Sequence, residues 1–126
     1  MNTKELGNLG EKIAQDYLKN KGYKILDKNY CFRIPGSPQK GEIDIIAKKD
    51  GVISFIEVKT LQNKGLSRIF SPEDKVNFLK RKRLRKTAEY WLTKNKIPLD
   101  SKWQINIIAI TINLVEKEAK IRYFKT

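Results

Sequence analysis

The sequence predicts an α/β fold in which helices flank a mixed central β-sheet. Two amphipathic segments have the apolar spacing of helices, and several short segments rich in β-branched residues have the composition of strands. Asp50-Gly51, between two of those segments, is a strong signal for a β-hairpin turn. The 126 residues are enough to bury one core, and no linker or repeat divides them, so we expect a single domain over residues 1–126.

The first element is predicted to be a helix from about Lys4 to Lys21. Thr3 is placed to cap its N-terminus, and Gly22 follows as a stop signal. Its apolar residues recur at helical spacing, so we expect them to face the sheet. These residues are Leu6, Leu9, Ile13, Ala14, Tyr17 and Leu18.

Three strands are predicted to follow this helix. The first covers Tyr23–Leu26 and continues irregularly through Asn29–Phe32, before the run Ile-Pro-Gly-Ser-Pro interrupts regular structure. The other two strands, Glu42–Ala47 and Val52–Lys59, are expected to form a hairpin through the Asp50-Gly51 turn.

The second half of the chain predicts a loop, a helix and two more strands. Thr60–Phe70 is polar and is expected to be a mobile loop, and Ser71-Pro72-Glu73-Asp74 has the cap, proline and acids of a helix start. That helix should end at about Lys94. Trp103–Ile112 is almost continuously apolar, as in a strand buried on both faces, and the more polar Lys120–Phe124 predicts an edge strand. Residues of the second helix expected to point inward are Val76, Leu79, Leu84, Ala88, Trp91 and Leu92.

The composition excludes several kinds of active site. The chain has no histidine, which rules out Ser-His and Cys-His pairs and histidine-ligated zinc. Its single cysteine, Cys31, rules out an internal disulfide, and the aromatic residues beside it predict a small buried side chain. Any catalysis must therefore rely on carboxylates and lysines, with a hard metal ion as a further candidate.

The charge balance predicts a polyanionic partner. Twenty-seven Lys and Arg against fourteen Asp and Glu give a net charge of +13, and nucleic acid is the polyanion that such proteins most often bind. An anionic membrane surface is the competing partner, but no segment combines a basic face with an anchored apolar face. The N-terminus lacks the apolar region of a signal peptide, so a cytoplasmic location is expected.

Charged residues inside the apolar strands of the predicted hairpin indicate a functional site. A two-residue turn at Asp50-Gly51 places Asp44 directly opposite Glu57, and Glu42 opposite Lys59. A longer turn would shift this register but keep these side chains on one face of the hairpin. Glu57 and Lys59 share a face in either case, because side chains two residues apart in a strand point the same way.

Paired carboxylates of this kind favour a divalent metal site. Asp44 and Glu57 would repel each other unless a cation lies between them, and Mg²⁺ or Mn²⁺ with oxygen ligands serves that purpose. In phosphodiester hydrolysis, Lys59 would orient water or stabilise the developing charge. The alternative is an ordinary solvated hairpin face that carries a Glu42–Lys59 ion pair.

Other charged residues are candidates for supporting roles. Glu11 is placed by helical spacing to look toward the sheet, where it could complete a metal shell, although a surface position remains an alternative. The basic run of the second helix wraps around all its sides, so only part of it can meet a nucleic acid. Such runs are usually solvated, but the net charge favours phosphate contacts by some members. The candidates are Lys80, Arg81, Arg83 and Arg85, with Lys64 and Arg68 in the preceding loop.

Four motifs together resemble a known bacterial family. Gly10-Glu11, Gly22-Tyr23, Gly41-Glu42-Ile43-Asp44 and Phe55-Ile56-Glu57-Val58-Lys59-Thr60 are similar to the YraN family. That family is uncharacterised, and it is similar to Holliday-junction resolvases and other PD-(D/E)xK nucleases. The resemblance covers nearly the whole chain and implies a restriction-endonuclease-like core of order α-β-β-β-α-β.

The resemblance also implies roles for individual residues. Asp44, Glu57 and Lys59 match the catalytic motif, Glu11 matches the helix acid, and the carbonyl of Val58 would join the metal shell. A homodimer is implied as well, because resolvases cut two strands with two sites.

The expected function is a Mg²⁺- or Mn²⁺-dependent endonuclease that acts on DNA, branched or otherwise structured, in repair or recombination. The alternative is a non-catalytic nucleic-acid-binding module whose acidic cluster is structural. Salt-sensitive binding is common to both functions, whereas cleavage with a metal belongs only to the first.

Overall fold

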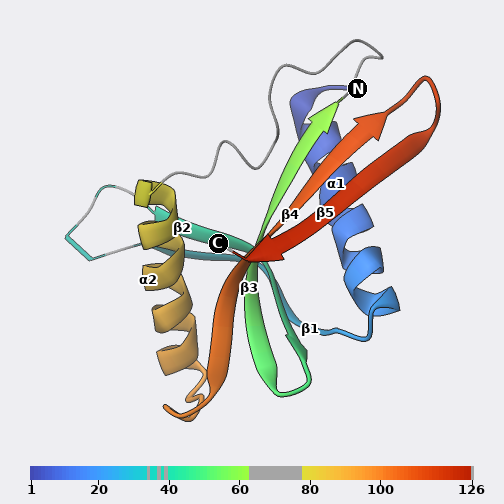
Figure 1. Ribbon diagram of the computed structural model, residues 1–126. Coiled ribbons are helices and arrows are strands. Elements are labelled where there is room, and N and C mark those ends of the chain that lie inside the picture. Colours follow the sequence, from blue (N-terminus) through green and yellow to red (C-terminus); the bar gives the residue numbers. More distant parts are fainter. Residues whose placement is uncertain (34, 37, 39, 63–77, 126) are drawn as a thin grey trace.

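The computed structural model describes residues 1–33, 35, 36, 38, 40–62 and 78–125. In this described part of the chain, two helices and five strands follow one another in the order α-β-β-β-α-β-β (Figure 1). They are α1 (Thr3–Asn20), β1 (Lys24–Arg33), β2 (Lys40–Lys49), β3 (Val52–Gln62), α2 (Phe78–Lys94), β4 (Lys102–Asn113) and β5 (Glu118–Lys125). The strands form one sheet of order β1-β2-β3-β4-β5, in which only the β3–β4 pair is parallel. The predicted mixed α/β fold is therefore confirmed.

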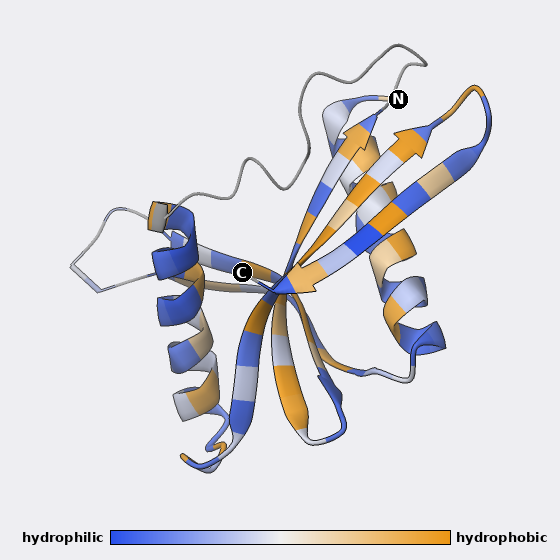
Figure 2. Cartoon of the chain, in the orientation of Figure 1, coloured by the Kyte–Doolittle hydropathy of each residue, from blue (hydrophilic) through white to orange (hydrophobic). Residues whose placement is uncertain are grey.

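The two helices cover opposite faces of this sheet (Figure 1). Under α1 lies a cluster built on Ala14, Leu18 and isoleucines of the central strands, and under α2 lies a second cluster built on Phe55, Leu84 and Trp91. Hydrophobic residues are concentrated on β3 and β4, while α2 is largely hydrophilic (Figure 2). The prediction that β4 is buried on both faces, with β5 at an edge, is confirmed.

The start of α1 differs by one residue from the prediction. The side chain of Asn2, rather than Thr3, is the cap: its Oδ1 accepts a hydrogen bond from Glu5 N (2.8 Å), and Glu5 Oε1 accepts one from Asn2 N (3.2 Å). This reciprocal pair is a capping box, which satisfies two backbone donors at once. Gly22 follows the helix with φ +92°, as its role as a stop signal requires.

The β2–β3 hairpin has the predicted turn. Asp50 and Gly51 both have positive φ (51° and 79°), which is the backbone of a two-residue turn whose twist matches that of the strands. The ladder runs from Lys49↔Val52 to Ile45↔Ile56 in the predicted register. β3 then continues to Gln62, so its last residues belong to a strand and not to the expected loop.

β1 is irregular, as predicted. Its register with β2 shifts between Ile25 and Asp27, and Asn29 has φ 52°. The bulged segment places the Asp27 carboxylate against α2, where Oδ2 accepts a hydrogen bond from Trp91 Nε1 at 3.1 Å. The prediction that Cys31 is buried is wrong: it is exposed, because it alternates with inward-packed neighbours on an edge strand.

The second helix presents Leu84, Ala88 and Trp91 to the core, as predicted, with Leu92 partly buried beside them. The prediction that Leu79 points inward is wrong, since its side chain is 65% exposed. Leu79 lies five residues before Leu84, about 140° around the helix from the apolar stripe. Val76 and the proposed start at Ser71-Pro72-Glu73-Asp74 lie outside the described residues. Across the part of the chain that is described, neither helix is long and apolar enough to span a membrane.

At Gly10, α1 approaches β3 closely. A Cβ added at Gly10 would overlap the side chain of Thr60. Gly10→Ala should therefore lower the free energy of unfolding by about 1–3 kcal/mol through overpacking. Gly7→Ala is the matched control, because nothing lies within 4 Å of its added Cβ and alanine favours a helix by up to about 1 kcal/mol. Urea unfolding of both variants tests this packing, and equal stability would contradict it.

Candidate functional site

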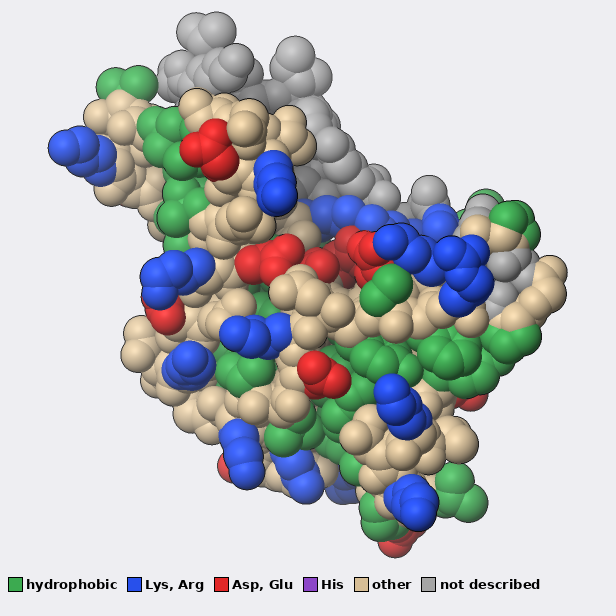
Figure 3. Space-filling model, turned by 180° about the vertical axis from the view of Figure 1, so that it is seen from behind, with side chains coloured by type: hydrophobic (Ala, Val, Ile, Leu, Met, Phe, Trp, Pro, Cys, Tyr) green, Lys and Arg blue, Asp and Glu red, His purple; other side chains and the backbone are tan. Residues whose placement is uncertain are grey.

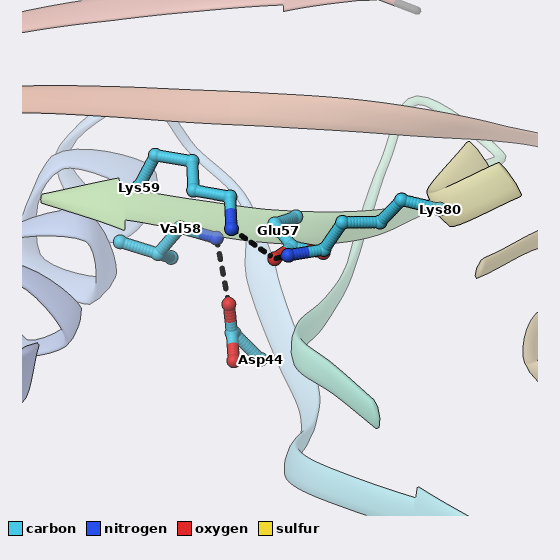
Figure 4. Close-up of polar contacts among 5 residues, drawn as sticks. All are labelled: Asp44, Glu57, Val58, Lys59 and Lys80. Atoms are coloured by element: carbon cyan, nitrogen blue, oxygen red, sulfur yellow. Dashed lines mark hydrogen bonds and ion pairs between the residues drawn. The ribbon is translucent and has the colours of Figure 1, made fainter. Parts of the chain in front are cut away.

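Asp44 lies where two strands part. Beyond Ile45↔Ile56, β2 continues its pairing with β1 while β3 continues its pairing with β4. The predicted register made Asp44 the ladder partner of Glu57, and this prediction is wrong because the β2–β3 ladder ends before that pair. Instead, Asp44 Oδ2 accepts a hydrogen bond from the backbone N–H of Val58 at 2.7 Å (Figure 4). The carboxylate supplies the acceptor that the β2 backbone no longer offers at that point.

The surroundings of Asp44 oppose its ionisation. Burial raises the pKa of its carboxyl to about 6, against the lowering effect of the Val58 hydrogen bond. The negative charges of Glu57 and Glu11 raise this pKa further, and Lys59 lowers it. A carboxylate in such a place is stabilised by any cation that approaches it.

Glu57 is the most buried acid of the site, with only 8% of the residue exposed. Its Oε1 forms two ion pairs, with Lys59 Nζ at 3.0 Å and with Lys80 Nζ at 2.7 Å. Lys59 comes from the same strand, and Lys80 reaches the carboxylate from α2 (Figure 4). Glu57 and Lys59 thus lie on one face, as the strand alternation predicted. Glu42 pairs with Lys40 at 3.2 Å and not with Lys59, so the alternative ion pair does not form.

The two lysines respond differently to this shared carboxylate. Burial and the hydrogen bond with Lys80 lower the pKa of Lys59, outweighing the attraction of Glu57. Burial also acts to lower the pKa of Lys80, but its hydrogen bonds with Glu57 and Lys59 and the attraction of Glu57 raise it overall. Of the two lysines, Lys80 therefore keeps its proton, and with it the positive charge, more readily than Lys59.

Glu11 faces the same cavity as the two strand acids. Burial raises the pKa of the Glu11 carboxyl, while a hydrogen bond with the side chain of Asn29 lowers it and the charge of Glu42 raises it. The cavity has a volume of about 310 Å³. Its lining consists of Thr3, Leu6, Gly7, Glu11, Asp44, Glu57, Val58, Lys59, Thr60 and Leu61. The structure thus brings Glu11, Asp44, Glu57, Val58 and Lys59 together around one space.

A second cavity, of about 220 Å³, lies on the α2 side of the same acids. Asp44 and Glu57 line both cavities, so they stand between them. The other residues of the second cavity are Lys40, Glu42, Lys80, Arg83 and Leu84. On the face seen in Figure 3, acidic and basic side chains lie next to one another across the middle of the molecule.

Comparison with known proteins defines the family. A model of the uncharacterised protein family UPF0102 matches residues 10–120. The chain belongs to the UPF0102 family. This confirms the resemblance to the YraN family, which is the same family. A UPF0102 protein of Alkaliphilus oremlandii is 38% identical over 122 residues, covering 97% of this chain and 96% of the relative. A UPF0102 protein of Clostridioides difficile is 42% identical over 117 residues, covering 93% and 92%.

A solved structure is also similar to this UPF0102 chain, at lower identity. It is an fdxN element excision controlling factor protein from Anabaena variabilis, 12% identical with a TM-score of 0.43. The match covers 94% of this chain and 99% of that protein.

The basic residues predicted to contact nucleic acid take different positions in the UPF0102 structure. Arg83 lines the second cavity, Arg81 is exposed, and the guanidinium of Arg85 lies 5.4 Å from the ring centre of Trp103. Lys64 and Arg68 lie outside the described residues.

Two residues of the UPF0102 site were not anticipated from the sequence in their observed roles. Lys80 was expected to contact phosphates, but it forms an ion pair with Glu57. The side chain of Asn29 forms a hydrogen bond with Glu11. The irregular stretch of β1 was a usable signal for Asn29, since asparagine tolerates positive φ. Nothing in the basic run distinguished Lys80 from its neighbours.

Proposed function

We propose that this UPF0102 chain is a divalent-metal-dependent endonuclease of the PD-(D/E)xK type that hydrolyses phosphodiester bonds of DNA. Branched or otherwise structured DNA in repair or recombination is the proposed substrate class. The observation that carries the proposal is the partly buried carboxyl of Asp44, set beside Glu57 and Glu11 at a cavity of a strongly basic protein.

The donor set fits a hard cation such as Mg²⁺ or Mn²⁺. Its side-chain donors are three carboxylates, with no histidine or thiol among them, and hard cations prefer such oxygen ligands. Among the described residues, no three of these side chains are already arranged to hold an ion. Glu11, Asp44 and Glu57 would therefore draw together when a cation offsets their repulsion, with the carbonyl of Val58 as a further ligand.

Each residue of the proposed site has its own role in binding the metal or in the reaction. When bound, Mg²⁺ or Mn²⁺ supplies a Lewis acid that activates water and offsets charge on the transferring phosphoryl group. Asp44 and Glu57 hold the cation, and Glu11 completes its shell from α1. Lys59 lies 3.0 Å from Glu57, where its side chain can orient the attacking water or stabilise the charge that develops on the phosphate.

The positive charge of the chain supports a nucleic-acid substrate. The excess of Lys and Arg gives +13, and phosphate contacts position a duplex without reading its sequence. Arg83, beside the acids, and the exposed Arg81 are proposed to make such contacts. A homodimer is proposed by resemblance to resolvases, because cutting both strands of a branched DNA requires two sites.

A cleavage screen tests this function. The protein is incubated with labelled four-way junction, flap, single-stranded and duplex DNA, with Mg²⁺, with Mn²⁺ or with EDTA. We expect cleavage only with a metal, and loss of cleavage in Glu57→Gln. Glu89→Gln is the matched control, because Glu89 is exposed on α2 and lines neither of the two cavities of the site. Equal cleavage by the wild type and Glu57→Gln would refute the assignment.

A second candidate function is a non-catalytic nucleic-acid-binding module. It is favoured by the two ion pairs of Glu57, which neutralise this acid without any metal. The module would bind DNA in a salt-dependent way, with the logarithm of the binding constant falling by about 0.9 per contacted phosphate for each log unit of salt. It would cleave none of the substrates with any metal.

A further inference from the structure

Lys80 has a position that the proposed function does not yet use. Its Nζ lies 2.7 Å from Glu57 Oε1, the same oxygen that Lys59 Nζ approaches at 3.0 Å. Two ammonium groups therefore share one oxygen of a carboxylate that is almost buried. One positive charge is enough to neutralise Glu57, so a divalent cation that binds this oxygen would have to compete with both lysines.

The two lysines differ in their freedom to leave Glu57. Lys59 lies on the same central strand as Glu57, and its side chain is 19% exposed. Lys80 belongs to a different element, α2, and its side chain is 31% exposed. It also lines the second cavity together with Arg83, on the side of the acids away from α1. A lysine ammonium on its flexible stem can move from Glu57 into that cavity.

We propose that Lys80 is a positioning residue that couples divalent-cation binding to phosphate binding. Without a metal, its ammonium pairs with Glu57 and neutralises the acid. When a divalent cation takes Glu57, repulsion between like charges moves the ammonium into the second cavity, where it binds a backbone phosphate of the nucleic acid. The inference rests on the proposed function of the site, because it takes Glu57 as a metal ligand.

The coupling follows from linkage. A phosphate that binds Lys80 removes the competitor for Glu57, so nucleic acid should tighten metal binding, and the metal should tighten nucleic-acid binding by the same factor. Coupling factors between linked sites are typically about 5 to 150. Metal and substrate would therefore enter the site together more readily than either enters alone.

Calorimetric titration with Mn²⁺ provides the first test. Lys80→Met should bind Mn²⁺ more tightly than the wild type, because no ammonium has to be displaced from Glu57. Lys82→Met is the matched control: Lys82 is exposed two residues farther along α2, and its replacement should leave Mn²⁺ affinity unchanged. Weaker or unchanged Mn²⁺ binding by Lys80→Met would overturn the proposal.

The affinity for DNA provides the second test. Fluorescence anisotropy with a labelled four-way DNA junction is measured with Ca²⁺ and with EDTA, and a gel verifies that the DNA stays intact. We expect Ca²⁺ to tighten binding at least about fivefold in the wild type and in Lys80→Arg, and by a much smaller factor in Lys80→Met. Lys80→Arg keeps the charge and shows that the effect does not come from misfolding. An equal Ca²⁺ effect in Lys80→Met and the wild type would overturn the proposal.

The outcomes separate this inference from the proposed function. If the wild type binds no Mn²⁺ and cleaves no DNA, the proposed function fails and the inference fails with it. If the wild type binds Mn²⁺ and cleaves DNA, while Lys80→Met keeps the full Ca²⁺ effect, only the inference is refuted.

Discussion

Asp44→Asn is expected to abolish metal-dependent cleavage and to make the metal-free protein more stable. The substitution removes a ligand charge, and a catalytic metal contributes several kcal/mol to phosphoryl transfer. Since about 1.4 kcal/mol corresponds to a tenfold change in rate, we expect cleavage to fall by about a thousandfold or more. The Asn side chain keeps an acceptor for the Val58 N–H without the cost of burying a charge.

The stability gain of Asp44→Asn should depend on pH. Because burial raises the pKa of Asp44 from 3.8 to about 6, the folded protein binds a proton more tightly than the unfolded chain. Stability that depends on this group is therefore present in full below pH 3.8 and is lost as pH rises through about 6. Asn has no such loss, so the variant's advantage should be absent near pH 4 and complete above pH 6, with a ceiling of about 3 kcal/mol.

Thermal unfolding in EDTA between pH 4 and 8 measures this difference. Asp100→Asn is the control, because Asp100 is exposed and distant from the site acids in the sequence. A variant Asp44→Asn that is less stable than the wild type at pH 8 would contradict the account of Asp44. An advantage that stays constant across the pH range would contradict it as well.

Lys59→Met is expected to separate catalysis from metal binding. Loss of one preorganised donor at a developing charge typically costs about a hundredfold to a thousandfold in rate. The same change removes one ammonium from Glu57, so Mn²⁺ affinity should stay equal or increase. Lys48→Met is the control on the neighbouring strand β2, where Lys48 is exposed.

Turnover and Mn²⁺ affinity, measured on the same preparations, decide the role of Lys59. We expect kcat to fall in Lys59→Met while Lys48→Met behaves like the wild type. Wild-type kcat in Lys59→Met would show that the lysine takes no part in the reaction. Lost Mn²⁺ binding would show that it supports the metal site and not the chemistry.

The local features of the site were predictable because they depend on short-range chemistry. Asp50-Gly51 specifies a two-residue turn, which sets the hairpin register up to Ile45↔Ile56. The alternation of side chains along a strand is enough to put Glu57 and Lys59 together. Helical spacing likewise predicted that Glu11 faces the sheet.

The remaining features depend on contacts between distant segments. The point at which β2 leaves β3 for β1 decides how Asp44 meets Val58, and no local pattern marks where a ladder ends. Lys80 reaches Glu57 only because α2 packs across that face. The burial of Cys31 was mispredicted for a similar reason, since its aromatic neighbours indicated a core position but β1 is an edge strand.

Calorimetric titration of the metal-free protein with Mn²⁺ tests the central claim, that Asp44, Glu57 and Glu11 form a divalent-cation site. We expect saturable binding by the wild type and by the exposed control Glu89→Gln. Binding should be at least about tenfold weaker in Glu57→Gln, since losing a charged ligand costs more than about 1.4 kcal/mol. No binding by the wild type, or equal binding by Glu57→Gln, would contradict the claim.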